Sequence, residues 1–493
     1  MMKLCTATLA SARQGTAVPS YDRTTVRPGI VHIGMGNFHR AHQAVYLDRL
    51  LTRDPTARDF GLVGVNLLEQ DERLARVMAG QDRLYTVLER HEDGTTAARI
   101  VGSIVDNLWA PDGTEPIIRA LADPRTRIVT LTITEGGYCQ DPVTGEVDLA
   151  EPGLQADLAH PRAPVTAFGY LAEGLRRRRS ASIAPFTVLS CDNVIGNGDL
   201  ARSVLLAFVT ALDPGLAEWV ATNVAFPNAM VDRITPRTSA ADVDEAEAAT
   251  GLRDDAPVPC EPFTQWVVED TFPSGRPSWE MVGVQMVDDV RPFELMKLRL
   301  INAGHQTIAY AGALLGHEFG WQACADPTVR RLLQHYLEHE GIHTVGTVPG
   351  VDLHAYCDSV VERFSNPRIP DTMARLCNQS STMLSTFLLP VARDLLRDGR
   401  DLHAVATVVA CWTRFVRERR DEHGRPLELV DTRSDDLHIR ATRDDPLALI
   451  RGNPIFAGLD DDPRFVEVYT RILHDMGRLG VRRAIDDVLA SAA

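Results

Sequence analysis

Apolar and polar positions follow two different patterns along this chain, and the first covers about its first half. There, short apolar runs rich in Val, Ile and Thr alternate with longer amphipathic stretches such as 41–51 and 115–121. This alternation predicts strand–helix–strand units, and therefore a mostly parallel sheet with helices on both faces. The stretch 210–259 is acidic and Ala-rich, with little strand character. The candidate strands are 29–33, 61–65, 99–105, 128–133 and 186–191, with two late runs at 266–268 and 279–286.

The second pattern begins at about residue 291 and is helical. Leu, Ile, Val and Ala recur there at intervals of three and four, which is the spacing of one helix face. Prolines at 349, 367, 370, 390 and 426 interrupt this periodicity and are expected to end helices. We therefore predict two domains, an α/β domain over 1–288 and an all-α domain over 289–493.

The composition is that of a globular protein with a sizeable core, because 44% of the 493 residues are apolar and 24% are charged. The 51 basic and 67 acidic residues give a net charge of −16, which argues against binding to nucleic acid. No apolar run approaches the ~18–20 residues of a membrane span. Eight cysteines without a CxxC pair indicate reduced thiols. We therefore expect a cytoplasmic protein, a monomer or small homo-oligomer, whose partner is a small molecule.

A turn containing glycine follows the first candidate strand. The string IVHIGMG carries Gly34 and Gly36 and leads into a predicted helix. In a dinucleotide-binding turn, the first glycine permits the tight bend and the second lets backbone amides approach a pyrophosphate. The third glycine of that fingerprint would fall at His39, so an ordinary strand-to-helix turn is the alternative. We predict a Rossmann-type dinucleotide site with the residues Gly34, Met35, Gly36 and Phe38.

Two acidic residues after the second candidate strand bear on which dinucleotide binds. Glu69 and Asp71 lie a few residues past 61–65. A carboxylate there can hold the adenosine ribose hydroxyls and repel a 2′-phosphate, which favours NAD over NADP. Both residues lie further from the strand end than is usual, however, and a charge at a helix N-terminus is the alternative.

The segment 293–310, FELMKLRLINAGHQTIAY, carries the candidate catalytic residues. On a regular α-helix, Asn302 and His305 share one face. Lys297 lies two turns before His305 on one stripe, and Glu294 precedes the lysine by three residues. A lysine whose pKa is lowered by its surroundings can take the hydroxyl proton of an alcohol, while amide donors hold the developing alkoxide. This set suits metal-free alcohol oxidation; an exposed helix with a core histidine is the alternative.

The same segment resembles the catalytic helix of the mannitol dehydrogenase family, the polyol-specific long-chain dehydrogenases. Lys297, Asn302 and His305 fill that family's K-x-x-x-x-N-x-x-H pattern without departure. Several rare strings in fixed order are more specific than the glycine turn alone. The other family-like strings are IVHIGMGNFHRAHQ (30–43), LYTVLER (84–90), TITEGGY (132–138), SCDN (190–193), FPNAMVDRITP (226–236) and ERFSNP (362–367) with a following Arg375.

The resemblance implies a metal-independent NAD(P) enzyme with an N-terminal Rossmann-type domain, a C-terminal helical domain and an active site between them. By analogy, Lys297 is the general base, and Asn193 and Asn302 donate to the substrate oxygen. His305 orients substrate hydroxyls, and Glu294 lies on a water path that passes the lysine proton to solvent. The residues to which the analogy assigns polyol or cofactor contacts are Arg375 and Asp232.

One position bears on substrate choice within the family. Gly136 in TITEGGY stands where the uronate-reducing branch tends to carry lysine, whose ammonium can pair with a sugar carboxylate. Glycine favours neutral polyols, although a simple strand-end turn also explains it. The resemblance therefore implies that the enzyme interconverts a D-polyol, with D-mannitol as the best choice, and its 2-ketose, D-fructose, with NAD. Alternatives are a fructuronate or tagaturonate reductase and an arabinitol or sorbitol dehydrogenase.

A competing motif, HYLEHEGIH, lies at 335–343. His339, Glu340 and His343 fill the zinc-protease string HExxH, and the inverted HxxEH form is also present. Gly341 and the TVGTVPG that follows indicate that the helix ends there, and no third ligand stands out. We therefore expect no metal site, because a zinc hydrolase leaves the lysine segment unexplained. The non-enzyme alternative is a protein that binds a dinucleotide or sugar and senses it without turnover. Such a sensor would not need the base that Lys297 offers.

Overall fold

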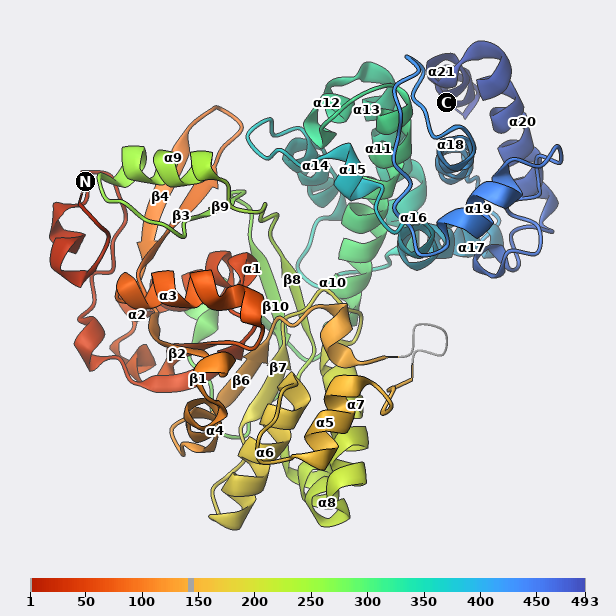
Figure 1. Ribbon diagram of the computed structural model, residues 1–493. Helices are drawn as coiled ribbons and strands as arrows, with labels where there is room; N and C mark the ends of the chain where they lie inside the picture. Colours follow the sequence, from red (N-terminus) through yellow and green to blue (C-terminus); the bar gives the residue numbers. More distant parts are fainter. Residues whose placement is uncertain (1, 141–145, 493) are drawn as a thin grey trace. The chain divides into compact units, whose positions relative to one another are not determined.

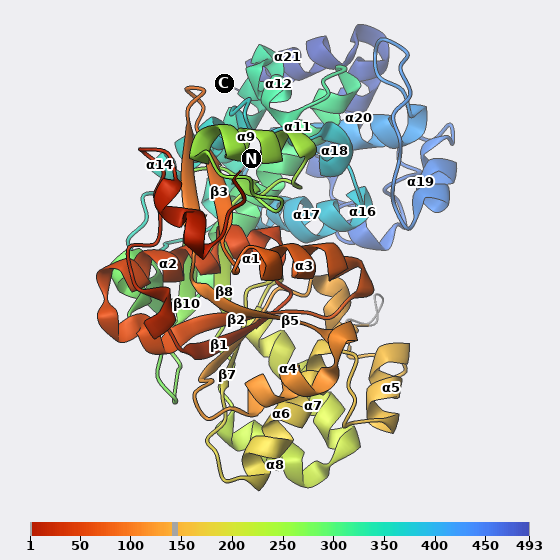
Figure 2. The same cartoon turned by 60° about the vertical axis from the view of Figure 1, so that its left-hand side comes forward.

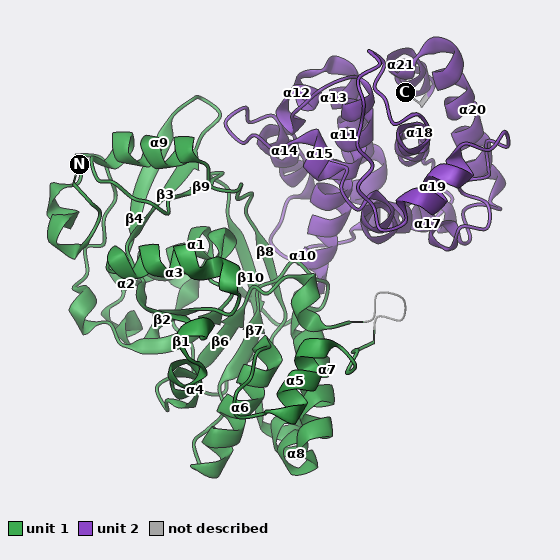
Figure 3. Ribbon diagram, viewed as in Figure 1, with its two compact units in different colours: residues 1–290 green, residues 291–493 purple. Residues whose placement is uncertain are grey.

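The computed structural model describes residues 2–140 and 146–492. The chain divides into two compact units, Met1–Val290 and Arg291–Ala493, which are called unit 1 and unit 2 below (Figure 3). Unit 1 contains parallel strands with helices between them, whereas in the described part of unit 2 the named elements are all helices. The structure therefore confirms the predicted fold class, α/β followed by all-α.

The central sheet of unit 1 is parallel. Among the described residues its strands are β1 (Pro28–Ile33), β2 (Gly61–Asn66), β5 (Ile104–Trp109), β6 (Ile128–Leu131) and β7 (Thr187–Ser190). They lie in the order β5-β2-β1-β6-β7, and every neighbouring pair is parallel (Figure 1). The order reverses at β1, and open α/β sheets bind ligands beyond the carboxyl ends of their strands at such a point.

Helices cover both faces of this sheet (Figure 2). The α-helices of unit 1 are α1 (Asn37–Ala41), α2 (Gln43–Arg53), α3 (Glu72–Gly80), α4 (Thr114–Ala122), α5 (Pro152–Ala159), α6 (Ala167–Ser180), α7 (Asn197–Leu212), α8 (Pro214–Asn223) and α9 (Ala240–Thr250), and the last of these lies over a different sheet. Ile30 of β1 packs into a core that includes α2, while the next residue, Val31, packs into a second core with α4, α6 and α7. The same alternation in β2, β6 and β7 buries both faces, which explains why these strands are almost uniformly apolar.

The apolar run 99–105, predicted as one strand, holds the end of one strand and the start of another. β4 (Thr96–Val101) pairs antiparallel with β3 (Tyr85–Arg90), whereas β5 pairs with β2 in the central sheet. Gly102 lies between them, and its amide donates to the buried carboxylate of Asp48 at 2.9 Å. A Cβ at Gly102 would come within 2.8 Å of a neighbouring side chain. The prediction was wrong because an apolar run does not show where a chain leaves one sheet for another.

Short strands also lie within 210–259, where little strand character was predicted. The remaining strands are β8 (Ala229–Asp232), β9 (Val258–Cys260), β10 (Gln265–Glu269) and β11 (Gln285–Val287). β8 lies in that stretch and β9 begins in it, and β10 contains the predicted run 266–268. The run 279–286 was wrong over its first half, because Trp279–Val282 is a 3₁₀-helix. Strands of three or four residues carry too little alternation to be recognised by pattern.

Unit 2 begins with one continuous helical path. α10 (Arg291–Met296) leads into the π-helical segment Lys297–Asn302, and this leads into α11 (Ala303–Leu314). The other helices are α12 (Gly320–Ala325), α13 (Pro327–His335), α14 (Leu353–Phe364), α15 (Met373–Leu376), α16 (Ser380–Met383), α17 (Leu389–Arg397), α18 (His403–Glu418), α19 (Ser434–Ala441), α20 (Pro463–Leu479) and α21 (Val481–Ala492). Every residue of α11 except His305 is buried, because α11 packs against α12, α13, α15 and α18. α11 is therefore the central helix of unit 2.

Pro390 was expected to end a helix, but it lies in the first turn of α17. The helical path enters α17 directly from the π-helical segment Leu384–Leu388, so this proline interrupts the regular hydrogen-bond pattern without ending the helix. None of the helices in the described ranges is long and apolar enough to cross a membrane.

Candidate active site

The turn that follows β1 has the geometry that a dinucleotide-binding turn needs. Gly34 adopts a φ of +98°, and a Cβ there would lie 2.1 Å from the carbonyl oxygen of Thr132, just past the end of β6. At Gly36, which precedes α1, a Cβ would meet nothing closer than 3.8 Å. The fold itself therefore requires the first glycine, whereas the second leaves open space against which a pyrophosphate can lie.

Two stacked histidines account for the missing third glycine. His39 occupies that position on α1, and its ring centroid lies 3.3 Å from that of His32 on β1. His32 is bonded through Nδ1 to the Thr130 hydroxyl (2.7 Å) and through Nε2 to the Thr132 hydroxyl (2.9 Å). Both histidines are buried, and burial lowers the pKa of His32 to about 3, so its ring is neutral. In the dinucleotide fingerprint the third glycine lets the helix pack closely on the strand. Here the two stacked rings lie between α1 and β1 instead.

The side chains of Met35 and Phe38, both predicted cofactor residues, lie differently. Met35 is buried over Gly64 of β2, where a Cβ would come within 2.2 Å of its sulfur. The Phe38 ring is partly buried and stacks on His42 with a centroid distance of 4.9 Å. The Met35 side chain therefore packs in the core, and only the backbone of this residue is left to contact a ligand.

Glu69 and Asp71 form a short 3₁₀ turn between β2 and α3. Glu69 is exposed and Asp71 is half-buried, and both precede the N-terminus of α3. A carboxylate that contacts a ribose and one that stabilises a helix N-terminus would both lie here, so the position of Glu69 and Asp71 fits both interpretations.

The sequence analysis missed Asn66, the last residue of β2. It is buried, and its Oδ1 has no hydrogen-bond partner among the described residues. Its place at a strand end was the available signal.

Asn193 follows β7 and is exposed. The preceding residue, Asp192, is fixed in place by hydrogen bonds. The buried carboxylate of Asp192 accepts hydrogen bonds from the backbone amides of Ile133 (3.1 Å) and Thr134 (2.8 Å). The Tyr138 hydroxyl donates to the same carboxylate at 2.8 Å. Burial raises the pKa of Asp192, and these donors oppose that effect. The TITEGGY turn beyond β6 is thereby tied to the end of β7.

Asp232, the last residue of β8, is buried near the same loop. The Asn197 side chain donates to the carbonyls of Asp192 (3.0 Å) and Ala229 (2.7 Å), and it accepts from the Ala229 amide (2.9 Å). The loop after β7 is therefore fastened to β8. This brings the segments of Asn193 and Asp232 into one group.

Gly136, the position that bears on substrate choice, is exposed. A Cβ there would meet nothing within 4 Å, and the residue is not among those with a positive φ. The next residue differs, since a Cβ at Gly137 would lie 2.8 Å from Ile133. The turn therefore has room for a side chain at Gly136, so the fold does not explain the glycine there.

The segment that carries Lys297 is not the regular α-helix that was predicted. Lys297–Asn302 is π-helical, and the Ala303 amide donates to the carbonyl of Leu298, five residues earlier. Residues five apart on an α-helix point about 140° away from each other. In a π turn, with its i→i+5 bonds, residue i+5 lies above residue i. Lys297 and Asn302 are therefore aligned, and the helix on which the sequence analysis placed Lys297 and His305 is not regular between them.

Lys297 and Glu294 are both buried, with exposed fractions of 8% and 7%. The alternative of a solvent-exposed helix is therefore excluded. Asn302 and His305 are half-buried, and the His305 ring stacks on Phe364 of α14 with a centroid distance of 4.1 Å. Phe364 lies in the family-like string ERFSNP, whose place beside the lysine segment the sequence did not show.

Arg375 lies on α15, which packs against α11. Its guanidinium is paired with Asp371, four residues earlier, and its side chain is 62% exposed. The predicted residues fall into two groups, one on each unit. Unit 1 carries Gly34, Met35, Gly36, Phe38, Glu69, Asp71, Asn193 and Asp232, and unit 2 carries Glu294, Lys297, Asn302, His305 and Arg375.

Lysine is scarce in this chain, a signal that the sequence analysis missed. Among its 51 basic residues only Lys3 and Lys297 are lysines. Arginine cannot lose its proton in a protein, whereas lysine can. A buried lysine in a chain that otherwise uses arginine is therefore a candidate for proton transfer, which arginine could not perform.

The HExxH string has a structural role. Glu340 is buried, and its carboxylate accepts hydrogen bonds from the amides of Ala404 (2.6 Å) and Val405 (2.8 Å) in the first turn of α18. His339, by contrast, has a side chain that is 61% exposed. The helix changes to a π turn at Tyr336–Glu340, so the string does not lie on the regular helix that a zinc site of this type needs.

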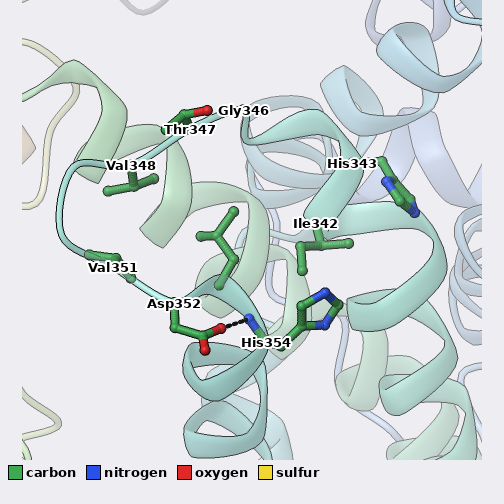
Figure 4. Close-up of a pocket in the computed structure, with 9 residues that line it drawn as sticks. Ile342, His343, Gly346, Thr347, Val348, Val351, Asp352 and His354 are labelled. Atoms are coloured by element: carbon green, nitrogen blue, oxygen red, sulfur yellow. Dashed lines mark hydrogen bonds between the residues drawn. The ribbon is translucent and has the colours of Figure 1, made fainter.

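An open pocket of about 440 Å³ lies beside this string (Figure 4). His343 and His354 line it, together with Asp352. The Asp352 carboxylate accepts a hydrogen bond from the His354 amide at 2.9 Å and caps α14. Within the ranges that the structure describes, no three His, Cys, Asp or Glu residues are grouped so that they could hold a metal ion.

The fold and these residues define the class: a dehydrogenase with a Rossmann-type unit and a helical unit. The profile of the mannitol dehydrogenase Rossmann domain matches residues 28–281, and that of the mannitol dehydrogenase C-terminal domain matches residues 289–476. The chain belongs to the mannitol dehydrogenase family.

Relatives match over nearly the whole chain. A mannitol 2-dehydrogenase of Pyricularia oryzae is 41% identical over 480 residues, which are 96% of this chain and 95% of that protein. The Pseudomonas fluorescens mannitol 2-dehydrogenase ternary complex with NAD and D-mannitol is 40% identical, with a TM-score of 0.87 and coverage of 99% of this chain and 100% of that one. A D-sorbitol dehydrogenase in substrate-free form is 38% identical, with a TM-score of 0.92 and coverage of 98% and 100%.

The two glycines of the turn should respond differently to alanine. Gly34→Ala should lower the free energy of unfolding by at least about 2 kcal/mol, because it combines a positive φ with a clash against backbone. Gly36→Ala should change it by less than about 0.5 kcal/mol, because its Cβ enters open space. Chemical denaturation monitored by tryptophan fluorescence measures both; equal losses would contradict the assigned geometry.

Glu340 should make stability depend on pH. Burial raises its pKa to about 8 in the folded chain, against about 4.3 when unfolded, so the folded state holds the proton between these values. Stability should therefore fall as the pH rises from 5 to 8. Glu340→Gln should reduce this fall in melting temperature by several degrees, since one pKa unit is about 1.4 kcal/mol and 1 kcal/mol is about 2–4 °C.

The control for this measurement is Glu338→Gln, because the Glu338 side chain is 50% exposed on the same turn. Its melting temperature should keep the pH dependence of the original protein. If Glu340→Gln keeps the same dependence as well, the assignment is wrong.

Proposed function

We propose that this chain is an NAD-dependent mannitol 2-dehydrogenase, which interconverts D-mannitol and D-fructose without a metal ion. Residues 1–288 bind the dinucleotide, and 289–493 supply the base. The proposal is carried by one observation, the buried Lys297 aligned with Asn302 by a π turn in a chain with two lysines. The P. fluorescens relative was solved with NAD and D-mannitol, which supports the choice of both ligands.

The base role follows from the chemistry of alcohol oxidation. Oxidising a secondary alcohol removes a hydride from the carbinol carbon and a proton from its hydroxyl. The nicotinamide ring, when bound, accepts the hydride. Lys297 accepts the proton at Nζ, which requires that its amine be neutral before the step. Burial favours the neutral form of a lysine, and no arginine of the chain can replace it.

The other residues hold the substrate. The side-chain amides of Asn193 and Asn302 donate to the reacting oxygen and stabilise negative charge as it develops. His305, whose ring is braced by Phe364, orients the neighbouring hydroxyls. Glu294 lies three residues before the lysine and passes its proton on through water. Arg375 and Asp232 contact the polyol or the edge of the cofactor.

The glycine turn holds the dinucleotide. Gly36 admits the pyrophosphate because space is open beside it; the backbone of Met35 lies in the same turn, and Phe38 lies in the first turn of α1. Glu69 and Asp71 hold the ribose hydroxyls and repel a 2′-phosphate, so NAD is preferred over NADP. All eight cysteines are free, which supports a cytoplasmic location, and we expect a monomer or small homo-oligomer.

The alternatives differ in substrate. A sorbitol or arabinitol dehydrogenase would use the same base, and the sorbitol dehydrogenase named above is similar over the full chain. A fructuronate or tagaturonate reductase is disfavoured, because Gly136 has room for a cationic side chain and carries none. A sensor without turnover leaves the buried lysine without a purpose.

Replacing the base should abolish turnover while the dinucleotide still binds. Lys297→Met and Lys297→Arg should both lower kcat for mannitol oxidation by about 10²–10⁴-fold, the contribution of a general base. Lys297→Arg isolates proton acceptance, because arginine is also a long basic side chain but cannot lose its proton to become an acceptor. NADH absorbance measures the rate, and quenching of tryptophan fluorescence measures dinucleotide binding.

Lys3→Arg is the matched control and should keep full activity, because Lys3 is exposed. The same assay with D-sorbitol, D-arabinitol, D-fructuronate and D-tagaturonate decides between the substrates; a higher kcat/KM for any of them than for the mannitol–fructose pair would replace the proposed one. Unchanged turnover in Lys297→Met would remove the base assignment.

Removing the acidic charge near the ribose should admit NADP. Asp71→Asn or Glu69→Gln should raise the kcat/KM ratio of NADP to NAD about tenfold or more, because about 1.4 kcal/mol of repulsion corresponds to that factor. Glu72→Gln, an exposed charge in the first turn of α3, is the control and should leave the ratio unchanged. If neither Asp71 nor Glu69 affects the ratio, neither residue faces the ribose.

A further inference from the structure

The π turn that aligns Lys297 with Asn302 needs something to hold it. Its hydrogen bonds are unusual for a helix, and π-helical turns occur mostly as single insertions at functional sites. In a regular α-helix, the Ala303 amide would donate to the carbonyl of Arg299, four residues earlier. Here the Ala303 amide donates instead to the carbonyls of Leu298 and Leu300. The Arg299 carbonyl therefore needs another donor.

That donor is the hydroxyl of Tyr336, at 2.6 Å from the Arg299 carbonyl oxygen. Tyr336 is fully buried, and burial raises the pKa of its hydroxyl, which therefore keeps the proton that it donates. The tyrosine occupies the acceptor that the Ala303 amide would use in an α-helix. It thus favours the i→i+5 register over the i→i+4 register.

The surroundings of this hydrogen bond are closely fitted. A Cβ at Gly341 would lie 3.1 Å from the Tyr336 ring and 3.3 Å from the Arg299 carbonyl oxygen, so glycine lets the two segments meet. The Arg299 guanidinium donates to Asp394 of α17 at 2.8 Å. Tyr336 itself begins a second π turn, whose last residue, Glu340, is bonded to the N-terminus of α18.

We propose that Tyr336 is a positioning residue for the reaction: its hydroxyl holds the π turn that sets the Nζ of Lys297 against the amide of Asn302. The inference rests on the proposed function for its effect on turnover. It concerns a side chain that acts only through the backbone of Arg299. Loss of the hydroxyl lets the turn relax toward the α-helical register, in which Lys297 and Asn302 point apart.

The test is Tyr336→Phe, which removes the hydroxyl and keeps the ring. We expect kcat for mannitol oxidation to fall about 10–100-fold, since a misplacement of about 1 Å can cost about 10²-fold. KM should change by less than about threefold, and the pH midpoint of kcat should move. The control is Tyr469→Phe, because Tyr469 of α20 is also fully buried and donates to a backbone carbonyl, that of Pro446, at 3.1 Å.

A second measurement needs no turnover. Lysine labelled with ¹³C at Cε should give two signals from this chain, and Lys3→Arg assigns them. In Tyr336→Phe the Lys297 signal and the midpoint of its titration should shift, while the Lys3 signal stays in place. In Tyr469→Phe neither should shift. If the original protein oxidises no polyol but the Lys297 signal shifts, the proposed function fails and the positioning role stands.

Two outcomes would overturn the inference. The first is a Lys297 signal and a kcat in Tyr336→Phe that match those of Tyr469→Phe, which would leave the hydroxyl a merely structural role. The second outcome concerns another variant, Gly341→Ala, which is the test if Tyr336→Phe does not fold. Gly341→Ala keeps the hydroxyl but crowds the ring, and it should lower kcat about threefold or more and shift the Lys297 signal; no change in either would contradict the proposal.

Discussion

The interval of five residues between Lys297 and Asn302 is the constraint on which the candidate active site depends. A regular α-helix would turn these side chains about 140° apart, too far for one substrate oxygen to meet both. A π turn adds one residue per turn without ending the helix, and so it aligns them. The neighbouring elements of unit 2 are arranged around this turn. The Arg299 carbonyl is bonded to Tyr336 and the Arg299 guanidinium to Asp394.

The use of lysine or arginine distinguishes a basic side chain that could transfer a proton from those that only form ion pairs. Both residues can form ion pairs, and this chain uses arginine for nearly all of them. Only lysine can lose its proton under working conditions, and a buried site favours that loss. The proposed proton transfer would explain a lysine at 297, whereas the buried Arg233 is paired with Glu89 at 2.7 Å, for which a permanent charge suffices.

The fold could be predicted where burial produces a recognisable pattern of apolar residues along the chain. β1, β2, β6 and β7 are apolar on both faces because helices cover both, and their runs were recognised. The prediction failed at 99–105, where Gly102 takes the chain from one sheet to another, and at the short strands β8 and β9. Partners distant in the chain, such as Asp48 for Gly102, settle those points, and a local pattern does not contain them.

The sequence by itself determined the family and the order of an α/β and a helical unit, and it supplied the candidate residues for alcohol oxidation, because these depend on composition, period and rare strings. Only the tertiary structure decided how the residues are used. HExxH became a helix cap because Glu340 meets the amides of α18, more than sixty residues further on. The lysine segment became a π turn because a hydroxyl from another helical segment bonds to its backbone. Hydrogen bonds between distant segments select among local conformations of similar energy, and one segment alone does not reveal its partner.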